Sequence, residues 1–118
     1  MSAQPTVVFH MLPKATWDTL PPGSDYQADT LAAEGFAHCT AEPPMLETVA
    51  NRFYRAQPGD WVILVVDLEQ VGAEVRWEAA DGHLFPHIYG PIEQRAVIRV
   101  VPFPRRPDGT YYLQEGTL

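Results

Sequence analysis

The pattern of hydrophobic and polar positions divides the chain into several short predicted elements. Residues 61–68 form an almost uninterrupted apolar run (WVILVVDL), which predicts a strand buried on both faces at the centre of a sheet. Residues 74–79 alternate between apolar and polar side chains, and residues 96–101 predict another strand. A first strand is expected over residues 6–12, where Pro13 stops it.

One helix stands out between these strands. Pro43 and Pro44 suit its first turn, and Pro58-Gly59 is expected to close it. Apolar residues recur at helical spacing and predict its buried stripe: Met45, Leu46, Val49, Ala50, Phe53 and Tyr54. The outer face is predicted to carry Glu47, Asn51, Arg52 and Arg55.

The remaining segments predict small elements and loops. Short helical turns are expected within residues 14–20 and 25–34, and a short strand over residues 36–40 after Gly35. Residues 85–91 are expected to be irregular and residues 102–109 to form a Pro-rich loop, while residues 110–118 either add an edge strand or trail. Many strands around one good helix predict an α+β fold with small split sheets. Since 118 residues are too few for two ordinary cores, residues 1–118 are expected to form a single domain.

Composition and charge exclude several classes of function. A net charge of −7 argues against binding duplex nucleic acid, although a local pocket for one phosphate is compatible with it. No apolar run approaches the roughly 20 residues that cross a membrane. Cys39 is the only cysteine, and the N-terminus lacks the basic region of a secretory signal. These features predict a reducing, cytoplasmic environment.

Histidines are the first candidates for chemistry, because imidazole serves as acid, base, metal ligand or phosphate donor near neutral pH. Three lie in strand-like segments beside aromatic residues: His10, His38 and His87. His83 instead follows Asp81-Gly82 in a predicted turn. Alternation in residues 36–40 places His38 and Cys39 on opposite faces, which disfavours a nucleophile built from this pair.

Two further groupings allow both a structural and a functional interpretation. In an extended segment Phe85, His87 and Tyr89 share one face, either as an aromatic core wall or as part of a site. Glu78 lies on the polar side of its strand, where it either pairs with Arg76 or serves as a general base or ribose-binding carboxylate.

Other candidates have a simple structural interpretation. Tyr54 is expected to pack in the core and Glu34 to be exposed to solvent. His83 and His87 have a zinc-like spacing, but Phe85-Pro86 argues against the helix that it requires.

Three segments closely resemble a bacterial family known as domain of unknown function 952. They are residues 34–40 (EGFAHCT), 49–54 (VANRFY) and 85–91 (FPHIYGP). The resemblance covers nearly the whole chain, from His10 and Trp17 through Glu78 to the strand at residues 96–101.

The resemblance implies a remote relationship to the ADP-ribosyltransferase fold, in which a split pair of small sheets holds NAD in a cleft. His10 matches the family position that contacts the nicotinamide-side ribose, but Met11 stands where a Gly commonly follows. Tyr54 resembles the Tyr that stacks on nicotinamide, and Glu78 is the best candidate for the Glu of a His-Tyr-Glu triad. Residues 37–40 (AHCT) look closer to the RNA 2′-phosphotransferase branch, whose strand His helps hold phosphate.

The leading hypothesis is a domain that binds NAD or a related small-molecule nucleotide and cleaves it or transfers ADP-ribose. The candidate catalytic residues are Glu78, His38 and His87, and the candidate cofactor-binding residues are His10, Tyr54 and Tyr89. No metal cofactor and no membrane partner are expected. The alternatives are a non-enzymatic ligand-binding or interaction module, an RNA 2′-phosphotransferase-like enzyme, and metal-dependent hydrolysis through His10, His38 and His87.

Overall fold

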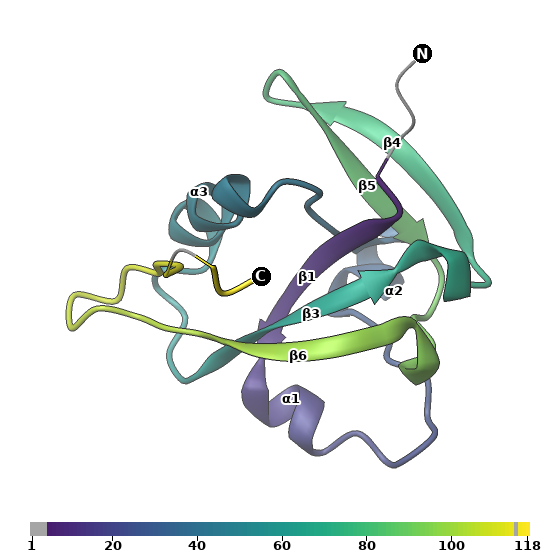
Figure 1. Cartoon of the computed structure of the whole chain (residues 1–118), viewed down its shortest axis with the longest axis horizontal. Coiled ribbons are helices and arrows are strands. Elements are labelled where there is room, and N and C mark those ends of the chain that lie inside the picture. The colour runs from purple at the N-terminus through teal and green to yellow at the C-terminus, as the bar shows by residue number, and fades with distance from the viewer. Residues whose placement is uncertain (1–4, 115) are drawn as a thin grey trace.

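The computed structural model describes residues 5–114 and 116–118, and these form two antiparallel sheets of three strands each (Figure 1). The first sheet has the order β1-β3-β6, with β1 at Val7–Pro13, β3 at Trp61–Asp67 and β6 at Val97–Phe103. The second has the order β2-β5-β4, with β2 at Ala37–His38, β5 at His83–Tyr89 and β4 at Glu74–Ala80. The predicted α+β class with small split sheets is confirmed. Residues 1–4 and 115 of the predicted domain lie outside the described residues.

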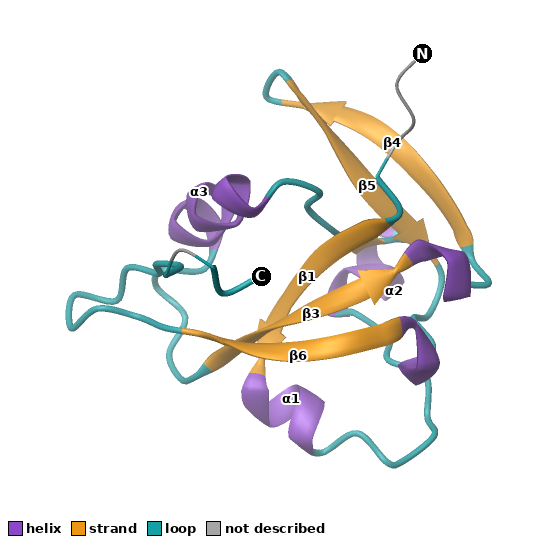
Figure 2. Cartoon of the chain, viewed as in Figure 1, coloured by secondary structure: helices purple, strands orange, loops and turns teal. Residues whose placement is uncertain are grey.

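Helices and 3-10 turns lie in the connections between the strands, except between β4 and β5, which a tight turn joins (Figure 2). They are α1 (Lys14–Asp18), α2 (Asp29–Glu34) and α3 (Pro43–Phe53), with two 3-10 turns, η1 (Leu68–Gln70) and η2 (Gln94–Ala96). The described residues contain no helix that is long and apolar enough to cross a membrane.

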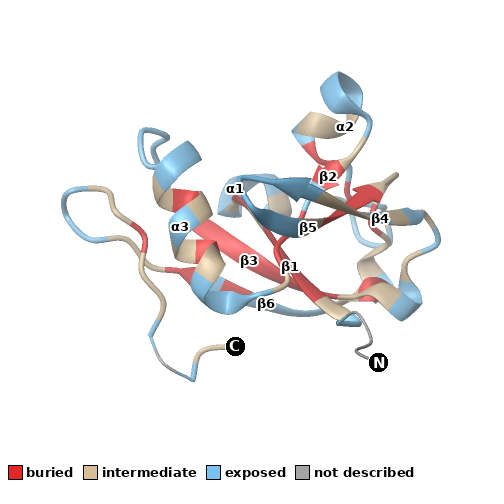
Figure 3. Ribbon diagram, turned by 90° about the horizontal axis from the view of Figure 1, so that it is seen from above, coloured by how far each residue is buried: buried red, intermediate tan, exposed pale blue. Residues whose placement is uncertain are grey.

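Strand β3 is buried on both faces, as its apolar run predicted. Its side chains alternate, so that Val62, Leu64 and Val66 enter one core cluster and Trp61, Ile63 and Val65 enter another. The first cluster includes Ile88 of β5 and fills the space between the two sheets, whereas the second packs against α3 through Leu46 and Ala50. Figure 3 shows the buried residues concentrated along β1 and β3.

The two sheets are joined at Phe9 of β1. Its backbone N–H donates to the carbonyl of Thr40, and the Thr40 N–H donates back to Phe9, each over 2.8 Å. Thr40 follows β2 by two residues. This bridge holds the edge of the second sheet against the first.

The aromatic segment at residues 85–91 was wrongly expected to be irregular. Residues 83–89 form a regular strand that pairs with β4 along its whole length. Pro86 is accommodated because it lies opposite Cys39, just past the end of the two-residue strand β2, where a missing N–H costs little. The Pro86 carbonyl still accepts a hydrogen bond from the Cys39 N–H.

Helix α3 ends at Phe53, before the predicted stop at Pro58-Gly59. The chain after it turns, and the Arg105 guanidinium donates hydrogen bonds to the carbonyls of Arg55, Gln57 and Gly59. These tertiary bonds satisfy carbonyl groups outside the helix, which local periodicity could not indicate. In the C-terminal segment, the described residues show only an isolated bridge between Tyr111 and Arg105, so that segment forms no edge strand there.

Candidate functional site

A cleft of about 640 Å³ lies between α3 and the β4–β5 hairpin. Its volume falls within the range of about 300–1,000 Å³ that is typical of small-molecule and cofactor sites. Thr30 and Glu34 of α2 and Met11 of β1 complete the boundary. The other lining residues are His38, Cys39, Thr40, Met45, Thr48, Val49, Arg52, Phe53, Tyr54, Ala80, Asp81, His83, Phe85 and His87.

The α3 wall of the cleft is largely apolar. Met45 and Val49 lie on one side of the helix, and the Tyr54 ring stacks on Trp61 with the centroids 4.8 Å apart. Burial is the main cause that raises the pKa of Tyr54. Phe53 was wrongly expected in the core: it is 58% exposed, because α3 ends there and its ring is left at the cleft. The wall therefore offers apolar and aromatic surface to a planar ring.

The opposite wall carries a cluster of aromatic and imidazole rings. His38 of β2 is the register partner of His87 of β5, and the two rings are 5.1 Å apart in an edge-to-face arrangement. Phe36 stacks on His87 with the centroids 4.1 Å apart and also contacts Tyr89. The alternation predicted for Phe85, His87 and Tyr89 is consistent with Pro86 and Ile88 being buried beneath them.

Glu78 lies behind His87 on the same face of this sheet. Its carboxylate Oε1 accepts hydrogen bonds from the Tyr89 hydroxyl at 2.5 Å and from His87 Nδ1 at 2.8 Å. Both hydrogen bonds lower the pKa of Glu78, and the bond from Tyr89 has the larger effect. The simple interpretation of Glu78 as a partner of Arg76 was wrong, because Arg76 forms its ion pair with Glu74 at 3.0 Å.

The Glu78 contact determines which nitrogen of His87 is available. A carboxylate that accepts from Nδ1–H fixes the imidazole tautomer and leaves Nε2 as the free acceptor. No described residue forms a hydrogen bond with Nε2, and His87 lines the cleft. His38 pairs differently, with Nε2 donating to the Glu34 carboxylate at 3.0 Å. A carboxylate thus orients each imidazole, and His87 is the one whose carboxylate partner lies outside the cleft lining.

His10 lies outside the cleft lining, in the core between the sheets. Its Nδ1–H donates to the His38 carbonyl at 2.7 Å, and its Nε2 accepts from the Tyr26 hydroxyl at 2.9 Å. Burial lowers the pKa of His10 to about 4, so the ring is neutral near pH 7. Because side chains alternate along β1, Met11 rather than His10 reaches the cleft.

The predicted site residues therefore separate into three groups. His38, Tyr54 and His87 line the cleft, whereas Glu78 and Tyr89 lie behind His87 on the sheet. His10 touches this arrangement only through the backbone of His38.

The sequence reasoning missed two charged lining residues, Arg52 and Asp81. Arg52 Nη1 donates to Asp81 Oδ2 at 2.7 Å across the gap between α3 and the hairpin turn. The only sequence signal was the Asp-Gly turn at residues 81–82, which places Asp81 at a hairpin tip but does not indicate its partner.

The structure also bears on metal and cysteine chemistry. Within the described ranges, no three His, Cys, Asp or Glu side chains are grouped as they would be to hold a metal ion. The metal-dependent alternative requires His10, His38 and His87 as ligands. Both ring nitrogens of His10 already have hydrogen-bond partners, so neither is free to bind a metal ion. Cys39 is 3% exposed, and burial raises the pKa of its thiol to about 12. The thiolate needed for nucleophilic attack is therefore disfavoured.

The chain is similar over most of its length to a protein of known structure. The crystal structure of protein CC0527 from Caulobacter crescentus has 31% sequence identity and a TM-score of 0.74, with 92% of this chain and 95% of that chain covered. The solution NMR structure of CC0527 gives 29% identity and a TM-score of 0.70, with 89% and 90% covered. None of the curated proteins matches this chain. The model of the family described as protein of unknown function (DUF952) matches residues 11–100, so the chain belongs to the DUF952 family.

Proposed function

We propose that this domain binds a nucleotide, with NAD as the leading candidate, in the cleft between α3 and the β4–β5 hairpin. The observation that carries the proposal is His87, which lines the cleft while Glu78 occupies its Nδ1 and leaves Nε2 for the ligand. Tyr54, Phe53 and Phe85 supply the apolar and aromatic surface that a base or nicotinamide ring requires. The remote resemblance to ADP-ribosyltransferases supports NAD as the first nucleotide to test.

The same geometry supports hydrolysis of the nicotinamide glycosidic bond. Water attacks the ribose C1′ and its proton moves to His87 Nε2, while the C–N bond breaks and its electron pair leaves with nicotinamide. Because the nicotinamide ring of NAD is cationic, it departs neutral and needs no acid. Glu78 acts through His87, by fixing its tautomer and stabilising the imidazolium that forms.

A second function, binding without turnover, is favoured by one observation. Glu78 is the candidate Glu of the His-Tyr-Glu triad that the resemblance implies, where a carboxylate would stabilise the oxocarbenium-like transition state of glycosidic cleavage, and it is absent from the cleft lining. Its Oε1 is already occupied by Tyr89 and His87. A module that retained the ligand cleft but not the reaction would be consistent with this arrangement.

A proton NMR time course of NAD with the purified protein tests both functions in one sample. We expect broadening of the NAD resonances and growth of free nicotinamide signals. The His87→Gln variant should retain broadening and release nicotinamide about a hundredfold more slowly, in line with the loss of a general base. Glu78→Gln should also be slower, whereas the matched control Glu74→Gln, on the same strand but paired with Arg76, should match the wild type.

Each contrary result has a defined meaning. Broadening without nicotinamide would replace hydrolysis by the binding module. Unchanged NAD spectra at millimolar protein would overturn NAD as the ligand, and RNA with a 2′-phosphate end would be the next probe. Equal rates in wild type and His87→Gln, with both proteins folded by circular dichroism, would remove His87 from the reaction.

A further inference from the structure

The mouth of the cleft is crossed by an ion pair between elements far apart in the sequence. Arg52 comes from the last turn of α3, and Asp81 from the turn between β4 and β5, with Nη1 and Oδ2 2.7 Å apart. Both residues line the cleft. Their side chains are 59% and 62% exposed, so solvent screens the pair and it contributes little net stability.

Arg52 has a distinct position among the charged groups of the cleft. It is the only Lys or Arg among the described residues that line the cavity, whereas Glu34 and Asp81 supply negative charge. The whole chain carries −7, so within the cleft an anionic ligand would find its electrostatic attraction mainly at this guanidinium. Guanidinium geometry matches both carboxylate and phosphate oxygens.

We propose that Arg52 is the phosphate-binding residue of the cleft and that the Asp81 carboxylate holds the place of a ligand phosphate. The ligand class is then a nucleoside diphosphate or a dinucleotide rather than an uncharged nucleoside. A phosphate that reaches Arg52 displaces Asp81, breaks the weak bridge and frees the β4–β5 turn from α3. This inference rests on the proposed nucleotide site and adds its specificity-determining residue.

The hairpin turn makes Asp81 accessible to a clean substitution. Asp81 and Gly82 have φ values of 50° and 81°, and Ala80 pairs with His83, as in a two-residue turn with left-handed central residues. Asn is also favoured at the first of these positions. Asp81→Asn therefore removes the charge while keeping the turn, and the melting temperature should verify that the fold is intact.

Calorimetric titration with ADP and with adenosine tests the assignment. We expect wild type to bind ADP at least about tenfold more tightly than adenosine, because charged hydrogen bonds to phosphate are among the strong ones. Arg52→Gln should abolish this preference. The matched control Arg55→Gln, two residues beyond the end of α3 and paired with Asp108, should preserve it. Asp81→Asn should strengthen ADP binding by up to about fivefold and leave adenosine unchanged.

A double variant separates direct from indirect effects. If Asp81 acts by competing for Arg52, Asp81→Asn has no effect on ADP affinity in the Arg52→Gln background. Asp18→Asn, which removes an exposed carboxylate paired with Lys14, controls for net charge and should leave ADP affinity unchanged in wild type. Equal affinity for ADP and adenosine, or a preference that survives Arg52→Gln, would overturn the role of Arg52 but not the nucleotide site. Binding of neither ligand would overturn both proposals.

Discussion

At the scale of single residues, the four histidines show how environment separates one side-chain type into different tasks. His10 has both nitrogens bonded within the core, whereas His87 has one nitrogen held by Glu78 and the other facing no described partner. The first arrangement makes a neutral structural link, and the second prepares a ring for chemistry. Residue type alone therefore did not distinguish them.

The burial of His10 makes stability depend on pH in a defined window. Its pKa is about 4 in the folded protein against an ordinary value of 6.5, so the unfolded chain binds the proton more readily between these values. Stability contributed by the neutral ring is complete above pH 6.5 and is lost progressively as pH falls to 4, with a total of about 3 kcal/mol.

Urea unfolding at several pH values tests this dependence. His10→Asn keeps a donor for the His38 carbonyl but cannot titrate. The variant should be less stable than wild type at pH 7, and the difference should shrink as pH falls toward 4. A difference that stays constant across this range would contradict the role assigned to His10.

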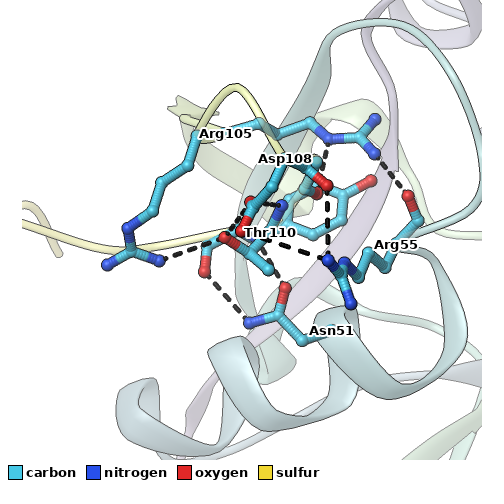
Figure 4. A network of polar contacts seen from close by, with 8 residues as sticks. Asn51, Arg55, Arg105, Asp108 and Thr110 are labelled. Carbon is cyan, nitrogen blue, oxygen red and sulfur yellow. Dashed lines mark hydrogen bonds and ion pairs between the residues drawn. The ribbon is translucent and has the colours of Figure 1, made fainter.

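At the scale of elements, α3 depends on the C-terminal segment for its position. Asn51 donates to the Tyr111 carbonyl at 3.0 Å and accepts from the Tyr111 N–H at 2.6 Å, as a side-chain substitute for strand pairing. Nearby, Arg105 lies over the Tyr111 ring and Asp108 bonds Thr110 (Figure 4). The C-terminal partners in these contacts lie beyond residues 11–100, which the family model matches. Since α3 forms one wall of the cleft, this C-terminal segment also supports the shape of the site.

Replacing Asn51 should weaken this attachment measurably. Asn51→Ala leaves a partly buried N–H and carbonyl of Tyr111 without partners, which should lower the free energy of unfolding by about 2 kcal/mol. Chemical denaturation checks the value. Glu47→Ala is the matched control, because Glu47 lies one turn earlier and makes no side-chain hydrogen bond with the described residues; it should change stability by less than about 0.5 kcal/mol.

At the scale of the whole molecule, β3 connects two hydrophobic cores. Leu64 is fully buried between the sheets, and Ile63 is fully buried toward α3. Neither core can open without exposing one face of the same strand. We therefore expect the domain to unfold as one cooperative unit.

Truncations in the two cores test this cooperativity. Leu64→Ala and Leu46→Ala should each cost about 3 kcal/mol, as buried leucine truncations do, because both side chains are fully buried. Urea unfolding followed by tryptophan fluorescence and by far-UV circular dichroism should give one coincident transition in each variant. Transitions that separate in either variant would show that the cores unfold independently.

The sequence by itself determined the features that depend on local periodicity. Residues 61–68 indicated the buried central strand, and the apolar spacing after Pro43 indicated α3. These conclusions hold because helix and strand repeats are imposed by backbone geometry within a few residues. The strand through Pro86 was missed, because Pro has no N–H to donate and local rules therefore exclude it from a strand. Those rules do not show that the neighbouring strand β2 ends before the position opposite Pro86.

Only the tertiary structure decided which side chains meet. Tyr89 and His87 reach Glu78 because β5 pairs with β4. Arg52 reaches Asp81 because α3 lies across the cleft from the turn that joins β4 to β5. His10 and Met11 are neighbours in sequence, yet the faces of β1 send one to the core and the other to the cleft. Such contacts depend on the pairing of distant segments, whose free energy is shared over the whole fold and is not encoded in any short stretch of residues.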